Sequence, residues 1–390
     1  MARSSSNPFQ FGGELTPAAL VDREDELDAV VDAMTHAGKL YLVGPRRYGK
    51  TSILRAASDR VTAAPRKGIV MRYDAEAFTT LELLASRILS DTAARLTPTI
   101  EKAGAAIKEF FKSVRPTATY NATDNKWTVS LAGSPGRATG APLLADVLDG
   151  VERAARKTRK PVALVIDEFQ KVITDGGADA EAQIRAAIQR HERVGYVFAG
   201  SNTRLLADIT ADPRRPFYKL GEVRFIGALP RKDFASFLEK GFATGGIRTA
   251  PGAVDAVLDL AEEIPYNVQL LAHECWDMTR ADRSPVLTVA KVRAARDTMA
   301  WRNDPIYSQM WVALTATQQK ALLALLRETA GPTSTEVSRK YAIPVPTMQK
   351  ALVALESKGL IREEPSRASA HLRLEDPLFG AWIELAIPRS

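Results

Sequence analysis

Two short stretches of the sequence carry residue types that bind and cleave phosphates. The segment "GPRRYGKTS" (44–52) has the spacing G-x-x-x-x-G-K-[ST], in which glycines let the backbone approach an anion and the lysine neutralises it. The segment "ALVIDEF" (163–169) ends an apolar run with two carboxylates, Asp167 and Glu168. In phosphoryl transfer, one carboxylate helps to hold Mg²⁺ and another residue orients the attacking water. Together the two segments predict phosphoryl-transfer chemistry.

The glycine-rich segment supplies most of the predicted nucleotide contacts. These are Gly44, Pro45, Arg46, Arg47, Tyr48, Gly49, Lys50, Thr51 and Ser52. We expect Thr51 and Asp167 to hold Mg²⁺ and Glu168 to act as the catalytic base. The alternative is an accidental basic turn, in which the two arginines and the lysine are simply solvated.

The flanks of this segment distinguish the two interpretations. A phosphate loop leaves a strand and enters a helix, so that the helix N-terminus points at the anion. Residues 39–44 are a compact apolar run that predicts a strand, and residues 50–60 predict a helix with Ile53, Leu54 and Ala57 facing inward. The context therefore favours a phosphate loop.

Strands and helices alternate to about residue 226. The predicted strands are 39–44, 68–76, 161–171 and 195–202, and the predicted helices lie within 14–37 and at 50–60, 79–96, 143–157 and 179–193. Continuous apolar strands such as 161–171 are buried on both faces, as parallel sheets require. The pattern predicts an α/β P-loop NTPase with a doubly wound parallel sheet. Residues 113–142 interrupt it and predict a hairpin insertion that turns at Asp124 and Asn125.

The remainder of the chain has a different character. Residues 229–305 show only helical signals and predict an all-α lid domain. Residues 306–390 show three helices followed by a β-ribbon, which is the order of a winged helix-turn-helix. We therefore expect three domains, 1–228, 229–305 and 306–390.

The third helix of the predicted winged helix has one apolar face. In "VPTMQKALVALESKGL" (345–360), helical spacing places Met348, Leu352 and Leu355 inward. The outward face then includes Thr347, Gln349 and Lys350, which are the candidate DNA-contacting residues. That face carries little charge, so a contact with a protein partner stays open as the alternative.

With these motifs, the chain resembles AAA+ type P-loop ATPases of the archaeal-ATPase family, kin to the STAND ATPases and to archaeal replication initiators. The resemblance extends from "VDREDEL" (21–27) to "LEDPLFGAWI" (374–383). It implies that Arg23 lies against the adenine, and that Ser201 or Asn202 of "FAGSN" (198–202) contacts the γ-phosphate or its water. It also implies that Pro265, in the turn of the lid, lies at the nucleotide.

The sequence departs from the family pattern at two cationic positions. In "RPFYKLG" (215–221), Leu220 stands where the family has an arginine. Arg215, or failing that Arg214, is our prediction for a cation that completes a neighbouring subunit's site, which would require a homo-oligomer. The second departure follows Pro265, where no arginine or histidine serves as a sensor and Asn267 and Gln269 are weaker replacements. Both departures predict slow turnover.

Charge and composition limit the partners. The 390 residues have a formal net charge of +7, which favours an anionic partner, above all DNA. The sequence shows neither a signal-peptide core nor a membrane-length apolar run, so we expect a cytoplasmic protein without membrane association. Two functions remain open: a Mg²⁺-dependent ATPase coupled to DNA through the winged helix, and a slow STAND-like ATP switch whose winged helix contacts a protein partner.

Overall fold

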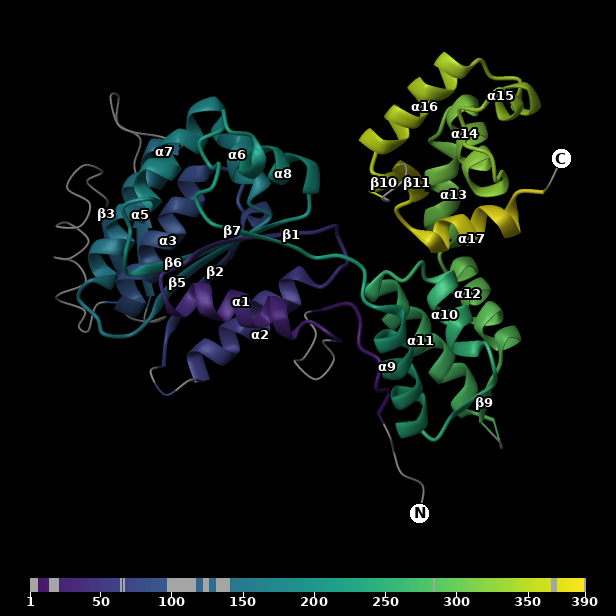
Figure 1. The fold of residues 1–390 in the computed structure, drawn as a ribbon, viewed down its shortest axis with the longest axis horizontal. Coiled ribbons are helices and arrows are strands. Elements are labelled where there is room, and N and C mark those ends of the chain that lie inside the picture. Colours follow the sequence, from purple (N-terminus) through teal and green to yellow (C-terminus); the bar gives the residue numbers. More distant parts are fainter. Residues whose placement is uncertain are drawn as a thin grey trace. The chain divides into compact units, whose positions relative to one another are not determined.

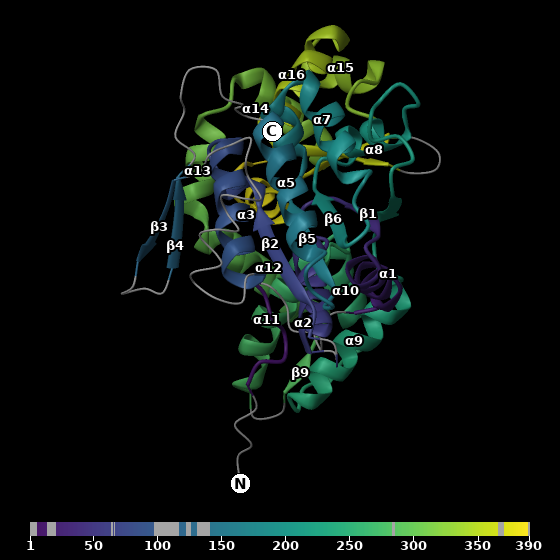
Figure 2. The same ribbon diagram turned by 90° about the vertical axis from the view of Figure 1, so that its left-hand side faces the viewer.

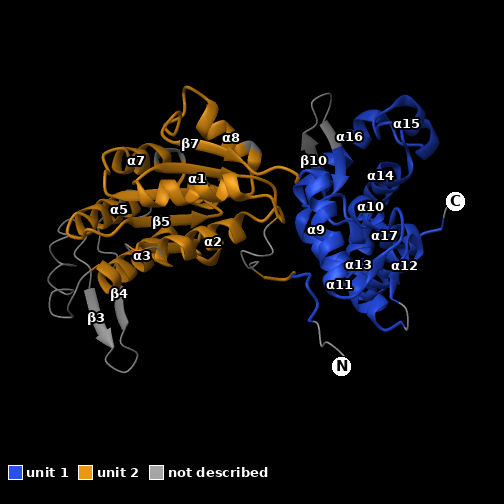
Figure 3. Cartoon of the chain, turned by 60° about the horizontal axis from the view of Figure 1, so that its bottom comes forward, with its two compact units in different colours: residues 1–10, 230–390 blue, residues 11–229 orange. Residues whose placement is uncertain are grey.

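The computed structural model describes residues 6–13, 21–63, 65, 67–96, 117–121, 126–130, 141–282, 285–365 and 370–388. The chain divides into two compact units (Figure 3). Unit 2 comprises residues 11–229, and unit 1 comprises residues 230–390 together with residues 1–10. None of the helices in the described part of the chain is both long and apolar enough to cross a lipid bilayer.

A five-stranded parallel sheet forms the centre of unit 2. Its strands are β1 (Lys39–Val43), β2 (Ile69–Asp74), β5 (Val162–Asp167), β6 (Val194–Gly200) and β7 (Glu222–Phe225). Their order is β2-β5-β6-β1-β7, so β6 separates the strand before the phosphate loop from the strand that ends in the carboxylates. Every residue of β5 and β6 is buried, as expected of central parallel strands. The predicted α/β P-loop NTPase fold is confirmed.

Helices cover both faces of this sheet (Figures 1 and 2). One face carries α1 (Glu24–Thr35) and α2 (Lys50–Ala63), and the other carries α3 (Leu81–Leu96), α5 (Ala141–Ala155) and α7 (Ala178–Ile188). The predicted inward residues of α2, namely Ile53, Leu54 and Ala57, are buried. The helices thereby shield the apolar strands from water, which is the main source of stabilisation for such a layered domain.

The strand predicted at 161–171 is shorter than expected. β5 ends at Asp167, because Glu168 has a φ of 51° in the left-handed region and cannot continue an extended strand. α6 (Gln170–Gly176) begins three residues after Asp167, and β6 is likewise followed by α8 (Thr203–Ala211). Neither short helix was predicted, since each has too few turns for a clear periodic pattern.

Part of the 113–142 segment is described. The backbone forms an antiparallel hairpin of β3 (Thr117–Asn121) and β4 (Lys126–Ser130). The predicted turn at Asp124 and Asn125 lies outside the described residues, as does the loop that follows β4.

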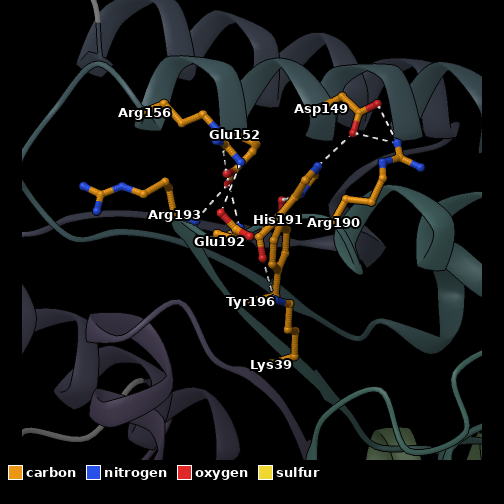
Figure 4. A network of polar contacts seen from close by, with 9 residues as sticks. All are labelled: Lys39, Asp149, Glu152, Arg156, Arg190, His191, Glu192, Arg193 and Tyr196. Carbon is orange, nitrogen blue, oxygen red and sulfur yellow. Dashed lines mark hydrogen bonds and ion pairs between the residues drawn. The ribbon is translucent and has the colours of Figure 1, made fainter.

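A buried polar network joins α5 to the start of β6 (Figure 4). It lies at the amino-terminal ends of the strands, whereas Asp167 and Glu168 lie at the carboxyl end of β5. The His191 side chain is 3% exposed, with Nδ1 2.7 Å from the Tyr196 hydroxyl and Nε2 2.8 Å from Asp149 Oδ1. Burial keeps Tyr196 protonated, because it raises the pKa of this hydroxyl well above its usual range. A neutral His191 that donates from Nε2 to Asp149 and accepts at Nδ1 from Tyr196 satisfies all three groups.

Glu152 of α5 belongs to the same polar network. Its buried carboxylate accepts hydrogen bonds from the backbone N–H groups of Glu192 (3.2 Å) and Arg193 (3.1 Å) and from Arg156 Nε (3.0 Å). These bonds connect α5 to the loop that enters β6. Lys39, the first residue of β1, donates to the His191 carbonyl at 2.7 Å and adds the neighbouring strand.

We expect this network to make unit 2 sensitive to mild acid. Burial lowers the pKa of His191 more than Asp149 and Glu152 raise it. The folded protein therefore favours neutral His191, and the associated stability is present above the unfolded-state pKa of about 6.5 and lost as the pH falls below it. His191→Gln should cost about 1–3 kcal/mol at pH 7.5, because Tyr196 and Asp149 lose their buried partner.

Urea unfolding of the wild type and His191→Gln between pH 7.5 and 5.5 measures this effect. The difference in free energy of unfolding should shrink as the pH falls. The charged and polar groups that face the ring, Asp149, Glu152, Arg190 and Tyr196, are the same in both proteins. His36→Gln is the matched control, since the His36 side chain is 70% exposed. Parallel stability curves for wild type and His191→Gln would contradict the prediction.

Unit 1 begins with four helices. They are α9 (Arg231–Thr244), α10 (Ala253–Leu260), α11 (Pro265–Arg280) and α12 (Val289–Arg302). The sequence predicted helices alone here, but the structure adds a parallel pair of two-residue strands, β8 (Arg248–Thr249) and β9 (Val286–Leu287). Strands this short leave no alternating pattern in a sequence.

The C-terminal part of unit 1 has the element order of a winged helix. The elements are α13 (Asp304–Val312), α14 (Ala316–Arg327), α15 (Thr335–Tyr341), α16 (Val345–Ser357), β10 (Ile361–Pro365), β11 (Ala370–Leu374) and α17 (Pro377–Ala386). The two strands pair antiparallel, as expected of the β-ribbon. In α16, Met348, Leu352 and Leu355 are buried as predicted.

Contacts cross the predicted boundary between residues 305 and 306. Trp382 Nε1 donates to Asp304 Oδ1 at 2.8 Å, and Ala300 of α12 belongs to the same apolar core as Phe379. Arg362 of β10 also pairs with Glu262 at 2.9 Å, and both side chains are largely buried. The predicted lid and the predicted winged helix thus belong to one compact unit, and the finer division into three domains stays a prediction.

The N-terminal segment differs from the expected assignment to a 1–228 core. Phe9 is buried within unit 1, with its ring centroid 4.7 Å from that of Phe242. Its carbonyl lies 2.8 Å from Nδ1 of His273, and Asn7 Nδ2 donates to the His273 carbonyl at 3.1 Å. A single buried aromatic ring and these bonds assign residues 6–10 to unit 1. Local sequence patterns do not reveal such a long-range contact.

Candidate active site

The phosphate loop connects β1 to α2 at the carboxyl edge of the sheet. Gly49 has a φ of 88° and open space around its Cα, so the backbone there is free to approach a ligand. Gly44 is required for packing, because a Cβ at this position would lie 2.7 Å from the Ile226 carbonyl. Both glycines of the motif therefore have a structural reason, and the local geometry supports a nucleotide-binding loop.

Lys50 is folded across this loop. Its Nζ donates to the carbonyls of Gly44 at 2.8 Å and Pro45 at 2.9 Å, and its side chain is buried. Burial lowers the pKa of Lys50, while Glu168 and Asp167 oppose that shift. The ammonium group is thus poised beside the loop backbone, where phosphate oxygens could accept its hydrogen bonds.

Thr51 and Asp167 bring a hydroxyl and a carboxylate together beside the loop. Thr51 Oγ1 donates to Asp167 Oδ2 at 2.7 Å. Burial raises the pKa of Asp167, although the Thr51 hydrogen bond lowers it. Hydroxyl and carboxylate oxygens are hard ligands that suit Mg²⁺, and a cation here would stabilise the buried carboxylate. The two residues predicted to hold Mg²⁺ are therefore in contact and fit the ion.

Glu168 is held by two neighbouring segments. Its Oε2 accepts hydrogen bonds from Ser201 Oγ at 2.8 Å, from Ser201 N at 3.2 Å and from Gln170 Nε2. Burial raises the pKa of Glu168, but the hydrogen bonds from Gln170 and Ser201 and the charge of Lys50 outweigh it, so the pKa lies below its ordinary value. Glu168 is therefore ionised at neutral pH, the state in which a carboxylate can orient a water molecule and accept a proton.

Sequence reasoning missed Gln170. Its amide reaches both the Glu168 carboxylate and Ser201 Oγ, the latter at 3.3 Å. A Cβ on Gly200 would collide with Gln170 Oε1, so the glycine makes room for this amide. In the sequence, Gln170 is marked only by its position three residues after Asp167. Its contact with Ser201 could be inferred only with the knowledge that β6, which Ser201 follows, lies beside β5.

The other residues of the phosphate loop differ in exposure, and Arg23 lies beside the loop. Tyr48 and Ser52 are buried, Arg47 is exposed with a φ of 69°, and exposed Arg46 pairs with Glu76 at 3.0 Å. Arg23 is 7% exposed and lies at the start of α1. It donates to the Gly227 carbonyl at 2.5 Å and pairs with Glu26 at 2.9 Å. Gly227 follows Ile226, which packs against Gly44, so Arg23 adjoins the wall of the loop.

The two predicted sensor residues have different local partners. Ser201 contacts Glu168, whereas Asn202 caps α8 by accepting a hydrogen bond at Oδ1 from Leu205 N at 3.0 Å. Pro265 is the first residue of α11, and Asn267 and Gln269 are buried within unit 1. These three residues belong to the other unit from the phosphate loop. Their proposed roles toward a nucleotide stay predictions.

The candidate arginines are engaged within their own chain. Arg215 forms a bidentate pair with the buried Glu181 of α7, with Nε 2.9 Å from Oε2. Arg214 pairs with its neighbour Asp212, and its side chain is 90% exposed. Leu220, at the position where the family has an arginine, packs against the apolar core. Of the two arginines, Arg214 is thus the more accessible.

The fold and this site define an ATPase of the AAA class. Residues 19–199 match the family model described as the AAA ATPase domain. This range contains the phosphate loop, the carboxylates at the end of β5 and most of β6. The chain therefore carries an AAA ATPase domain, and the nucleotide-binding prediction is confirmed at this level.

Three solved structures that are similar over nearly the whole chain are from Pyrococcus abyssi and Aeropyrum pernix. A Walker-type ATPase of Pyrococcus abyssi is 16% identical with a TM-score of 0.61, over 96% of this chain and 99% of its own. The ORC2 protein of Aeropyrum pernix, with ADPNP and ADP, is 14% identical with a TM-score of 0.54, over 95% of each chain. The ORC1 protein of Aeropyrum pernix, in complex with DNA, is 15% identical with a TM-score of 0.51, over 95% of this chain and 94% of its own. These likenesses concern the fold. No curated protein matches the sequence.

Proposed function

We propose that this ATPase couples the ATP and Mg²⁺ state of its site to DNA binding through the C-terminal part of unit 1. The Thr51–Asp167 hydrogen bond is the observation that carries the catalytic part, because it brings the metal-binding oxygens together beside the phosphate loop. Mg²⁺ there would supply positive charge for the transferring phosphoryl group. Glu168, oriented by Ser201 and Gln170, would accept the proton of the attacking water.

The exposed face of α16 supports the DNA-binding part of the proposal. Thr347, Gln349 and Lys350 are exposed on the side opposite the buried apolar residues. The third helix of a winged helix-turn-helix is the element that enters the major groove. The formal net charge of +7 favours a phosphate-rich partner, and the similar ORC1 protein of Aeropyrum pernix was solved in complex with DNA.

Charge removal on α16 tests the DNA contact. Lys350→Gln should weaken binding to duplex DNA about equally for unrelated sequences and reduce the slope of log K against log salt concentration by about 1, because one phosphate contact is lost. Fluorescence anisotropy over a salt series measures both quantities. Lys240→Gln, at an exposed position of α9 in the same unit, is the control. Unchanged affinity and slope for Lys350→Gln would leave the α16 face as a protein contact.

A second candidate function is a slow ATP switch whose winged helix contacts a protein partner. Three features favour it: Leu220 packed against the core, the uncharged Asn267 and Gln269, and the pairing of Arg215 with Glu181. Each leaves an expected catalytic cation either missing or already paired. In this alternative, ATP stabilises one conformation and hydrolysis resets it. The rate of a single turnover separates the switch from a rapidly cycling enzyme.

The predicted arginine finger gives the two candidates opposite outcomes. If Arg215 or Arg214 completes a neighbour's site, ATPase activity per subunit should rise with protein concentration and fall by about 10³-fold or more on substitution by alanine. ATP affinity should change little. Glu181→Gln is an informative companion, since it frees Arg215 from its pair and should not mimic Arg215→Ala. Activity per subunit that stays flat on dilution, with an inert Arg214→Ala/Arg215→Ala variant, decides for the switch.

A further inference from the structure

A hollow in unit 2, apart from the phosphate loop, is lined by arginines. It has a volume of about 440 Å³ and lies between α7 and the loop at residues 213–218. No residue of the phosphate loop and neither carboxylate of the active site lines it. The polar side chains that line it are Arg185, Gln189, Arg214, Arg215 and Tyr218. The volume is within the range of small-ligand pockets.

The walls of this hollow are held in place without a ligand. Phe217 is fully buried, with its ring centroid 5.7 Å from that of Phe169 and 6.1 Å from that of Tyr41. Pro213 and Pro216 restrict the backbone on the outer side of the loop. Arg215 joins the loop to α7 through its pair with Glu181. A binding surface formed in advance loses little conformational entropy when a ligand enters.

Arg185 is the arginine of this group that has a buried donor without an acceptor. The carboxylates of Glu181 and Asp212 are hydrogen-bonded to Arg215 and Arg214, and Asp208 also acts on Arg215. Arg185 Nε is buried and, in the described part of the chain, has no hydrogen-bond acceptor. A buried charged donor without an acceptor is destabilising, so an acceptor supplied by a ligand is favoured.

We infer that this hollow binds a small phosphate-bearing anion, with Arg185 as the principal contact. Arginine donors match the oxygens of a phosphate group in pairs. Arg214 lines the same hollow, and its 90% exposed side chain is accessible to an anion there. The site is separate from the phosphate loop and does not depend on ATP hydrolysis.

Titration with inorganic pyrophosphate tests this site. Pyrophosphate can also bind at the phosphate loop, so the titration uses the Lys50→Ala protein with and without Arg185→Gln. We expect one pyrophosphate per chain by calorimetry, at an affinity independent of protein concentration, and a loss of about tenfold or more on Arg185→Gln, equivalent to one charge-assisted hydrogen bond. Arg159→Gln, at an exposed arginine of the same unit that does not line the hollow, should change nothing.

A second variant tests the hollow independently, in case Arg185→Gln does not fold. Ala186→Glu keeps a good helix former on α7 and places a carboxylate at the hollow, where it should compete with the anion and abolish binding. Equal pyrophosphate affinity with and without Arg185, or no saturable binding in the Lys50→Ala protein, would overturn the inference. ATP binding by the wild type is measured separately, so failure of the hollow is distinguishable from failure of the ATPase site.

Discussion

Replacement of Lys50 by alanine is expected to abolish ATP binding. The lysine is the buried cation at the phosphate loop, where its Nζ is held by the carbonyls of Gly44 and Pro45. Arg46 is a poor substitute, because it is exposed and paired with Glu76. Each charge-assisted hydrogen bond contributes about 1.5–3 kcal/mol, so the loss of two predicts an affinity reduced by about 10²-fold or more. Isothermal titration calorimetry with ATP and Mg²⁺ measures it.

A matched lysine separates this effect from general charge loss. Lys160 is exposed in the same unit just before β5, and Lys160→Ala should bind ATP like the wild type. Thermal unfolding of both variants checks that the fold survives, since Lys50 also satisfies loop carbonyls. ATP affinity that is the same in Lys50→Ala and the wild type would refute the assignment of the phosphate loop.

Glu168→Gln should retain ATP binding and lose hydrolysis. The amide has nearly the same shape as the carboxylate and can still accept hydrogen bonds from Ser201, but it cannot take a proton from water. Loss of a general base costs about 10²–10⁴-fold in rate. Single-turnover phosphate release, compared with nucleotide affinity by calorimetry, measures the two properties separately.

The control for this substitution is Glu76→Gln. Glu76 is an exposed carboxylate that pairs with Arg46 of the phosphate loop. In the described part of the chain, no hydrogen bond joins it to Glu168. Its neutralisation should leave turnover near the wild-type rate. If Glu168→Gln hydrolyses ATP as fast as the wild type, another group must activate the water.

Much of the nucleotide site could be predicted from local sequence. The spacing of Gly44, Gly49 and Lys50, an apolar strand before them and a helix after them are all consecutive features, because the loop itself binds the phosphates. Likewise, the apolar run followed by Asp167 and Glu168 lies within the seven consecutive residues 163–169, so the pattern can be recognised from local sequence. The Thr51–Asp167 contact then follows from the rule that parallel strands end at one edge of a sheet.

Features that depend on which strands are neighbours were decided by the tertiary structure. Gln170 bonds to Glu168 locally, but it reaches Ser201 only because β6 lies beside β5, and the sequence does not specify that order. The pairing of Arg215 with Glu181 joins residues 34 positions apart and makes Arg214 the more accessible arginine.

The N-terminal segment shows the same distinction between local pattern and distant contact. Sequence by itself determined the residue types of the site and the secondary structure around them, since those depend on neighbours along the chain. The assignment of Phe9 to unit 1 depended on Phe242, more than two hundred residues away. Burial of such a ring is a property of packing between distant segments, and only the folded chain decides it.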